Sequence, residues 1–349
     1  MLWLPFLLKV NSWLGLNLGT AGFEYIYKNY DGPLYVIVAK TFYAHDTPYF
    51  AAHLPLYPAL IFVFKQIIGV FVKQLAYLKS MLLVNILSTI GLAGFFYYLV
   101  KKFRLTNHPM FLTATLLFLP RFLVVRVVGA PESLFMLLTL LSVYFFEKDK
   151  YFWAGIFGGL SVMVKSPGIL LFGAYGLVFL ERLFYKKRIE LKWFWTLLIP
   201  FGLLTVFLIY WRQMGDFLAY FHSGDNIHLM FPFAVFNYQK TWVGTAWLED
   251  VVFYYLLYGV AVVTLWKSKY RSFFYYSLVF FVATLFVQHR DISRYSLPIW
   301  PFAAIAFEKF LTDKKYRLIF FIILVGIYFY AWNFLSYNVM PIADWKPFL

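Results

Sequence analysis

The sequence predicts an all-α protein, a polytopic bundle of about eleven transmembrane helices, from three observations. Only 13% of the 349 residues are charged and 62% are hydrophobic, whereas soluble proteins average roughly 25% charged residues. The mean hydropathy is +0.71. Apolar residues recur along the chain in runs of about 15–25, close to the length that crosses a bilayer as a helix. A soluble enzyme, a nucleic-acid-binding protein and a disordered chain are therefore excluded.

Apolar runs bounded by charged residues or proline define the spans. Residues 2–18 are counted as a short first crossing, although Lys9, Asn11 and Ser12 interrupt them. Residues 54–72 begin Leu54-Pro55-Leu56-Tyr57-Pro58 and are predicted to form a juxtamembrane or re-entrant helix. The ten remaining spans are expected near 76–100, 109–125, 131–146, 151–165, 167–185, 193–211, 249–266, 272–287, 296–311 and 318–335.

Five basic clusters predict the orientation of these spans. Lysine and arginine beside spans collect on the cytoplasmic side, and the clusters at 101–104, 148–150, 186–192, 267–271 and 314–317 all fall on one side. The chain is then one membrane domain, 1–349, with its N-terminus inside. A first outer loop spans 19–75 and a second large outer loop spans 212–248. The net charge of +15 follows from this topology, and no nucleic-acid partner is expected.

Asp31 is the candidate catalytic base on the outer face. It lies in Asn29-Tyr30-Asp31-Gly32-Pro33-Leu34-Tyr35, where Asp-Gly-Pro is a turn signal. Residues 35–43 are predicted to form an amphipathic helix with Asp31 near its N-terminus. A carboxylate fixed beside apolar walls suits general-base chemistry. A plain turn is the alternative.

Several cations on or near the outer face indicate a bound anion. Ionisable groups at membrane depth are costly unless they face a cavity or a partner. Arg121 and Arg126 lie in the preceding span or at its end, and each needs an anionic ligand or a carboxylate such as Glu132, which otherwise caps its own helix. Lys165, Arg290 and Arg294 lie on the predicted outer side, whereas basic residues otherwise collect on the cytoplasmic side. The forked guanidinium of arginine is suited to binding a phosphate. An internal Arg–Asp pair is the alternative.

The first outer loop also carries His45, Asp46 and His53. Their spacing matches no defined metal motif, so no metal is predicted and solvated loop polarity is the simpler interpretation. The chain has no cysteine, which excludes disulfides, thiolate metal sites and a cysteine nucleophile.

Several motifs in this order resemble the PIG-V-like mannosyltransferases, the family of the GPI second mannosyltransferase and its prokaryotic relatives within the GT-C superfamily. The resemblance covers about 25–185, and only hydropathy and a basic outer turn at Arg290–Arg294 agree beyond it. Two positions differ from the family: relatives often have histidine where this chain has Leu34, and arginine where it has Lys165. The matching motifs are Asp31-Gly32 followed by Tyr35, Pro55-Leu56-Tyr57-Pro58, Glu132-Ser133-Leu134-Phe135 and Lys165 to Gly168.

The resemblance implies a GT-C fold and an inverting transfer of a sugar, with mannose expected, from a polyprenyl-phosphate carrier to an acceptor hydroxyl. Asp31 would deprotonate the acceptor. The expected partners are the lipid-linked donor, an acceptor glycolipid, glycan or protein, and membrane lipids, with no cofactor. Donor-phosphate binding is expected of Arg290, Arg294, Lys165 and Arg126, and substrate binding of Tyr35, Asp46, His53 and Glu132.

The expected location is a prokaryotic plasma membrane, with the active site outside, rather than the endoplasmic reticulum, because the sequence has no long tail. A flippase or transporter of lipid-linked sugars is the first alternative, although such proteins often contain inverted halves and no internal symmetry is visible here. A GT-C enzyme with glucose, arabinose or aminoarabinose as donor sugar, and a non-catalytic scaffold, are the others.

Overall fold

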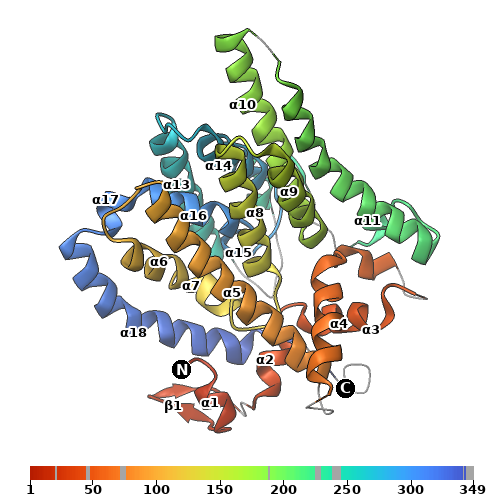
Figure 1. The fold of residues 1–349 in the computed structure, drawn as a ribbon. Coiled ribbons are helices and arrows are strands. Elements are labelled where there is room, and N and C mark those ends of the chain that lie inside the picture. The colour runs from red at the N-terminus through yellow and green to blue at the C-terminus, as the bar shows by residue number, and fades with distance from the viewer. Residues whose placement is uncertain are drawn as a thin grey trace.

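The computed structural model describes residues 1–19, 22–44, 48–70, 76–187, 189–224, 229–237, 245–340 and 342. The described chain is almost entirely helical, and its one sheet is a two-stranded hairpin. Helices α1 to α4 lie at one end of the molecule, and the far ends of α10 and α11 project beyond the other helices (Figure 1). The predicted all-α class is therefore confirmed in outline.

Five helical segments of the described chain are long and apolar enough to cross a membrane, because about 20 residues of helix span the hydrocarbon core. This is fewer than the roughly eleven spans expected, but it still indicates a membrane protein. Helices α8 (Glu132–Glu147), α9 (Tyr151–Val164) and α14 (Arg271–Leu285) match predicted spans, but with 16, 14 and 15 residues they are shorter than these five segments. The five segments are α5 (Ala76–Lys102), Ser166–Tyr185 with the 3₁₀ helix η2 (Ser166–Ile169) and most of α10 (Leu170–Lys186), Leu191–Met214 with η3 (Leu191–Leu197) and α11 (Leu198–Met214), α13 (Trp247–Leu265) and α18 (Lys314–Tyr337).

Basic helix ends gather at one end of the bundle. The Tyr270 hydroxyl, just before α14, donates to the Phe103 carbonyl oxygen after α5 at 3.3 Å. Arg271 Nε, at the start of α14, donates to Glu181 Oε2 in the last turns of α10 at 2.9 Å. The basic ends of α5 and α10 and the basic start of α14 therefore lie together, as the predicted orientation requires.

The predicted first crossing at 2–18 is wrong. These residues form a short helix, α1 (Leu4–Leu7), and a hairpin of β1 (Ser12–Trp13) and β2 (Leu16–Asn17). The two residues between the strands both have positive φ, which a tight hairpin turn of two residues requires. Trp332 Nε1, near the end of α18, donates to the Leu2 carbonyl oxygen. The N-terminus thus lies by the C-terminal end of α18, away from the basic helix ends.

Two other predicted spans are broken into shorter helices. Residues 109–125 form α6 (Pro109–Leu117) and α7 (Pro120–Val125), with Leu119 extended at ψ 126° because proline disfavours a helical residue before it. Residues 296–311 and the turn before them form α15 (Ile292–Tyr295), η5 (Leu297–Ile299), α16 (Trp300–Ala306) and α17 (Glu308–Leu311). Neither range is a single crossing.

The two predicted outer loops contain short helices. The first holds α2 (Glu24–Lys28), α3 (Gly32–Thr41), η1 (Pro48–Ala52) and α4 (Leu56–Ile68). With 13 residues, α4 is too short to cross the hydrocarbon core, which agrees with the juxtamembrane helix predicted at 54–72. The second holds α12 (Ala219–His222) and η4 (Ala234–Asn237).

Helices α9 and α11 pack with their backbones in contact. A Cβ added at Gly202 would lie 2.5 Å from the Gly159 carbonyl oxygen, and one added at Gly159 would lie 2.7 Å from the Leu198 carbonyl oxygen. Small residues allow this close approach between membrane helices. The contact fixes α9, whose C-terminal end is followed by Lys165.

We predict that Gly202→Ala destabilises the protein by about 1–3 kcal/mol, because the added methyl forces α9 and α11 apart. Gly94→Ala in α5 is the matched control, since a Cβ there meets no other atom within 4 Å. Thermal unfolding in detergent measures both. Equal melting temperatures for Gly202→Ala and the wild type would contradict this account of the contact.

Candidate active site

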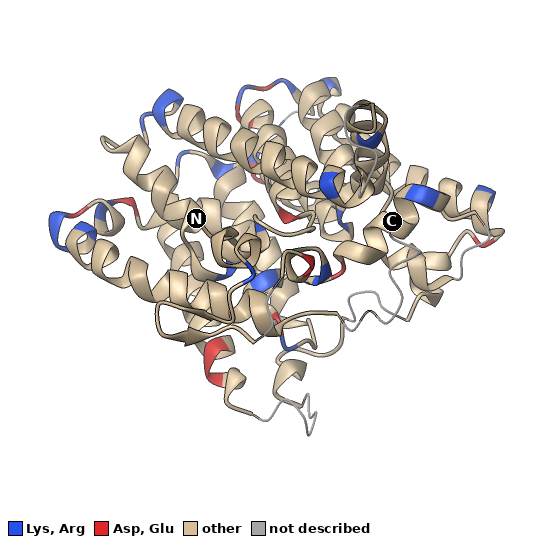
Figure 2. Cartoon of the chain, turned by 90° about the horizontal axis from the view of Figure 1, so that it is seen from below, with Lys and Arg blue, Asp and Glu red and all other residues tan. Residues whose placement is uncertain are grey.

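Four charged side chains meet at the end of the bundle away from the basic clusters. Asp31 directly precedes α3, Glu132 is the first residue of α8, Lys165 links α9 to η2, and Arg294 lies in α15. Seen from below, most of the chain is uncharged, and acidic and basic residues lie close together near the middle (Figure 2). The site is therefore assembled from segments up to 263 residues apart in sequence (294 − 31).

Glu132 is the centre of this cluster. Its Oε1 accepts hydrogen bonds from Lys165 Nζ and from Arg294 Nε, each at 2.7 Å. Its side chain is 1% exposed, against 16% for Lys165 and 10% for Arg294. Its second oxygen, Oε2, has no hydrogen-bond partner within the described part of the chain. A carboxylate at this depth stays charged only when it is paired, and here it is paired with two cations.

Arg294 is held on three sides. Nε binds Glu132, Nη1 lies 3.6 Å from Asp31 Oδ2, and the guanidinium carbon lies 4.2 Å from the centre of the Tyr30 ring. The planar guanidinium thus combines directed hydrogen bonds with stacking on an aromatic face. Asp31 is the more accessible partner, with its side chain 38% exposed.

Lys165 is the second cation of the cluster. Burial lowers the pKa of its ammonium group, and the Arg294 guanidinium lowers it further, while Glu132 and Asp31 raise it. Its ammonium nitrogen also lies 5.7 Å from the centre of the Tyr295 ring. The charge of Lys165 therefore depends on its carboxylate neighbours.

A second network beside the first is built on Arg121. Its Nη2 lies 3.3 Å from Asp291 Oδ1, its Nε donates to Ser293 Oγ at 2.8 Å, and its Nη1 donates to the Tyr30 hydroxyl at 3.1 Å. The proline break before α7 places this arginine here. Internal Arg–Asp pairs, considered from the sequence, thus exist: Asp291 pairs with Arg121, and Asp31 pairs with Arg294.

The segment before Asp31 is fastened to α18. The buried Asn29 side chain donates through Nδ2 to the carbonyl oxygens of Tyr25 at 2.7 Å and Leu335 at 3.0 Å. Its backbone forms an antiparallel bridge with Val339. Tyr30 has φ 52°, a left-handed conformation that turns the chain sharply just before Asp31. These contacts fix the position from which Asp31 projects.

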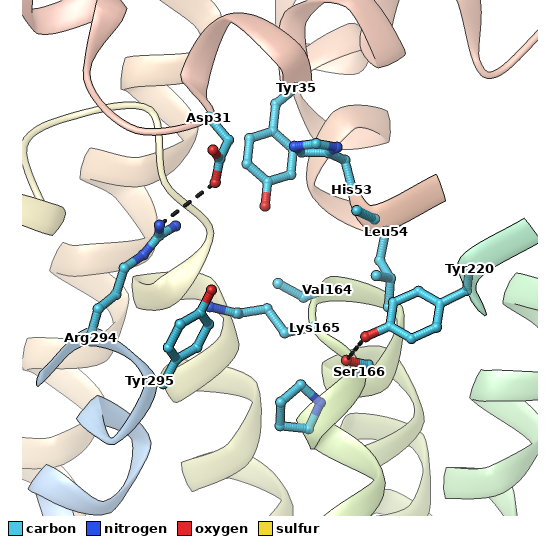
Figure 3. A pocket seen from close by; sticks show the side chains of 12 residues that line it. Asp31, Tyr35, His53, Leu54, Val164, Lys165, Ser166, Tyr220, Arg294 and Tyr295 are labelled. Carbon is cyan, nitrogen blue, oxygen red and sulfur yellow. Dashed lines mark hydrogen bonds and ion pairs between the residues drawn. The ribbon is translucent and has the colours of Figure 1, made fainter. Parts of the chain in front are cut away.

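The cluster borders a small cavity of about 70 Å³. Figure 3 shows Asp31, Tyr35 and His53 on one side, Arg294 and Tyr295 on another, and the Tyr35 hydroxyl pointing into the space above Lys165. Ser166 and Tyr220 close it, with their hydroxyl oxygens 2.7 Å apart. This cavity holds a carboxylate and two cations within one small volume.

Two larger cavities, each of about 500 Å³, adjoin the small one. The polar one shares Asp31, Arg294 and Tyr295 with it and is also lined by Arg121, Trp247 and the C-terminal residues 338–340. The apolar one shares Ser166, Pro167, Tyr220 and Tyr295 with it. Its apolar walls include Leu170 of α10, Leu203 and Phe207 of α11, and Phe280 and Ala283 of α14.

His289 lines the polar cavity and interacts electrostatically with the charged side chains around it. Its Nδ1 accepts a hydrogen bond from the backbone N–H of Asp291 at 2.9 Å. Burial lowers the pKa of the imidazole and outweighs Asp291, which raises it, and the nearby arginines lower it further. The neutral ring is therefore favoured, with its proton on Nε2.

The predicted site residues are partly brought together. Asp31, Tyr35, His53, Lys165 and Arg294 line the small cavity, and Arg290 lines the polar one. Two predicted residues line none of the three cavities. Glu132 binds the cations Lys165 and Arg294, and the Arg126 guanidinium lies 5.2 Å from the centre of the Phe118 ring. Asp46 lies outside the described residues.

Some lining residues had no sequence signal of their own. Tyr295 contributes to all three cavities, but in an aromatic-rich chain it does not stand out. Arg121 lies in the predicted span 109–125 and carried the same signal as Arg126, and only their positions in the first turn and at the C-cap of α7 separate their roles. Within the described chain, no three His, Asp or Glu side chains are grouped so that they could hold a metal ion.

Comparisons with family models, with curated proteins and with solved structures give no match to this chain.

Proposed function

We propose that the protein is an integral-membrane inverting glycosyltransferase of GT-C type that moves a sugar from a polyprenyl-phosphate carrier to an acceptor hydroxyl. One observation carries the proposal: Asp31 and two buried cations, Lys165 and Arg294, share a small cavity that adjoins an apolar cavity on one side and a polar cavity on the other. A lipid-linked sugar has the same order of chemistry, from a hydrocarbon tail through a phosphate to a sugar.

The donor side is assigned to the small and the apolar cavities. Lys165 and Arg294 would bind the phosphate and stabilise the charge that develops as it leaves. The isoprenoid chain would lie along α10, α11 and α14, where Leu170, Leu203 and Phe280 form an apolar wall. No soluble nucleotide-binding domain is needed for such a donor.

The acceptor side is assigned to the polar cavity, which Asp31 borders. In the reaction the acceptor oxygen forms a bond to the anomeric carbon while the bond from that carbon to the phosphate oxygen breaks. The acceptor proton passes to Asp31 and the bonding electrons leave with the phosphate. A base on the acceptor side and cations on the leaving-group side are what inversion in one step requires.

The location and the donor sugar are part of the proposal. The site lies at the bundle end away from the basic helix ends, and basic residues beside spans favour the cytoplasmic side. The site would then face outward from a prokaryotic plasma membrane. Mannose is the donor sugar expected from the family resemblance.

The first test is a transfer assay with purified protein in lipid, radiolabelled polyprenyl-phosphate mannose and a total membrane-lipid extract as acceptor. We expect Asp31→Asn to lower turnover by at least about 10²-fold, because a general base contributes about 10²–10⁴, with donor binding close to normal. Label that crosses the bilayer on its carrier in both proteins, without transfer, would instead support a flippase.

We predict that Arg294→Ala and Lys165→Ala each lower kcat/KM for the donor by about 10²–10³, the effect of removing one group that stabilises a developing anion. The KM for the acceptor is expected to change little. Kinetics with each substrate varied in turn measure both. If only the acceptor KM rises, the phosphate assignment is wrong.

The apolar cavity predicts a dependence on carrier chain length. Ala283→Trp fills the cavity and is expected to raise the donor KM about tenfold for a long-chain carrier, about 1.4 kcal/mol, with a smaller effect for a short-chain carrier. Val282→Trp is the control, because Val282 is an exposed neighbour on α14 outside the cavity lining. Equal effects of Ala283→Trp on both chain lengths would place the tail elsewhere.

A further inference from the structure

Glu132 stands out because it organises the small cavity without lining it. Its carboxylate is almost fully buried, and none of the three cavities includes it among its walls. We infer that Glu132 is a positioning residue, which holds the Lys165 ammonium and the Arg294 guanidinium at the cavity and keeps Lys165 charged, without touching the substrate. The consequence for catalysis rests on the proposed function, whereas the consequence for Lys165 itself does not.

Geometry is the first support for this role. A single oxygen, Oε1, accepts from two cations that come from different elements, the connector after α9 and the short helix α15. Two positive groups that are 16% and 10% exposed repel one another, and their repulsion is weakly screened at this depth. The carboxylate between them offsets that repulsion.

The distribution of the bonds is the second support. Glu132 occupies Nε of Arg294 and leaves Nη1 near Asp31. Arg294 also lines the small and the polar cavity, so its Nη groups, rather than Nε, are the ones that would bind a phosphate bidentately. Without Glu132 the guanidinium would lose the bond that sets this orientation.

The two cations respond differently to the loss of Glu132. Arginine does not deprotonate in proteins, so Arg294 would keep its charge. Lysine titrates readily when buried, and among the groups that raise the pKa of Lys165, Glu132 makes the largest contribution. The other charged or titratable groups around Lys165 and its cavity are Arg294 and Tyr295 from α15, Asp31 and Tyr35 at α3, His53 after η1 and Tyr220 from α12.

A pH dependence follows from this difference. Burial already lowers the pKa of Lys165, and Glu132→Gln removes the nearest opposite charge, so the pKa falls further. An adjacent charge changes a pKa by about 1–3 units. Protonated Lys165 would then be lost at a lower pH, and the alkaline limb of the donor kcat/KM profile would move down by about the same amount.

Competitive labelling tests the inference without any assay of transfer. Acetic anhydride reacts only with the deprotonated amine, so the acetylation of the peptide that carries Lys165, followed by mass spectrometry across pH, reports its titration. We expect the midpoint to be about 1–3 pH units lower in Glu132→Gln than in the wild type. Glu147→Gln is the matched control, a carboxylate at the opposite end of α8 that accepts from the Ser272 backbone N–H at 2.9 Å, and it should leave the midpoint unchanged.

Two further variants complete the test. Glu132→Gln/Lys165→Arg should restore the alkaline limb of the transfer profile, because the arginine cannot titrate, and a purely structural defect would not be rescued in this way. Glu132→Asp keeps the charge on a shorter side chain, so it should keep the labelling midpoint near that of the wild type while the donor KM rises. It also provides a measurement if Glu132→Gln does not fold.

The outcomes separate the inference from the proposed function. A lowered Lys165 midpoint in Glu132→Gln with no transfer by any variant, the wild type included, would support the role of Glu132 and overturn the glycosyltransferase. An unchanged midpoint, or an equal shift in Glu147→Gln, would overturn the role of Glu132 even if transfer is observed.

Discussion

A carboxylate buried among apolar helices must be paired to stay charged, and Glu132 is paired twice through the same oxygen. This constraint joins three parts of the chain, because the start of α8, the end of α9 and the helix α15 must meet at one point. The close backbone packing of α9 on α11 fixes where Lys165 emerges. The site is therefore stabilised by the same contacts that hold the bundle together at this end.

The walls of the three adjoining cavities change from apolar to polar across the site. Tyr295 borders all of them, with apolar walls on one side and polar walls on the other. A transferase that acts on a lipid-linked sugar needs a place for the hydrocarbon, a place for the phosphate and a base beside the acceptor. Under the proposed function, the apolar, small and polar cavities would take these parts in that order, and Asp31 lines both the small and the polar cavity.

Hydropathy predicted the long helices well, because membrane thickness sets their length. It failed where local chemistry interrupts an apolar run. The turn at Leu14-Gly15 places a hairpin within residues 2–18, and Pro120 breaks 109–125 into two helices. The position of Lys165 and Arg294 opposite the basic clusters singled them out in the sequence, since a cation near an apolar run requires a partner, and the fold brings both to Glu132.

Which charged side chains pair with one another could not be predicted from the sequence. Glu132 and Arg294 are 162 residues apart and meet only through the tertiary fold, so spacing carries no signal of their contact. Arg121 and Arg126 look alike in sequence, yet one binds Asp291 and the other packs on Phe118. Both arginines follow the proline break, one in the first turn of α7 and the other at its C-cap, and these five positions decide which of them reaches the site.

The most direct test of the account is a cryo-electron microscopy structure of the protein in lipid with a long-chain polyprenyl phosphate, the product that the reaction releases. We expect phosphate density in contact with Arg294 and Lys165, with the isoprenoid chain running along α10, α11 and α14. Density for the phosphate among the basic helix ends at the opposite end of the bundle, with an empty small cavity, would contradict it.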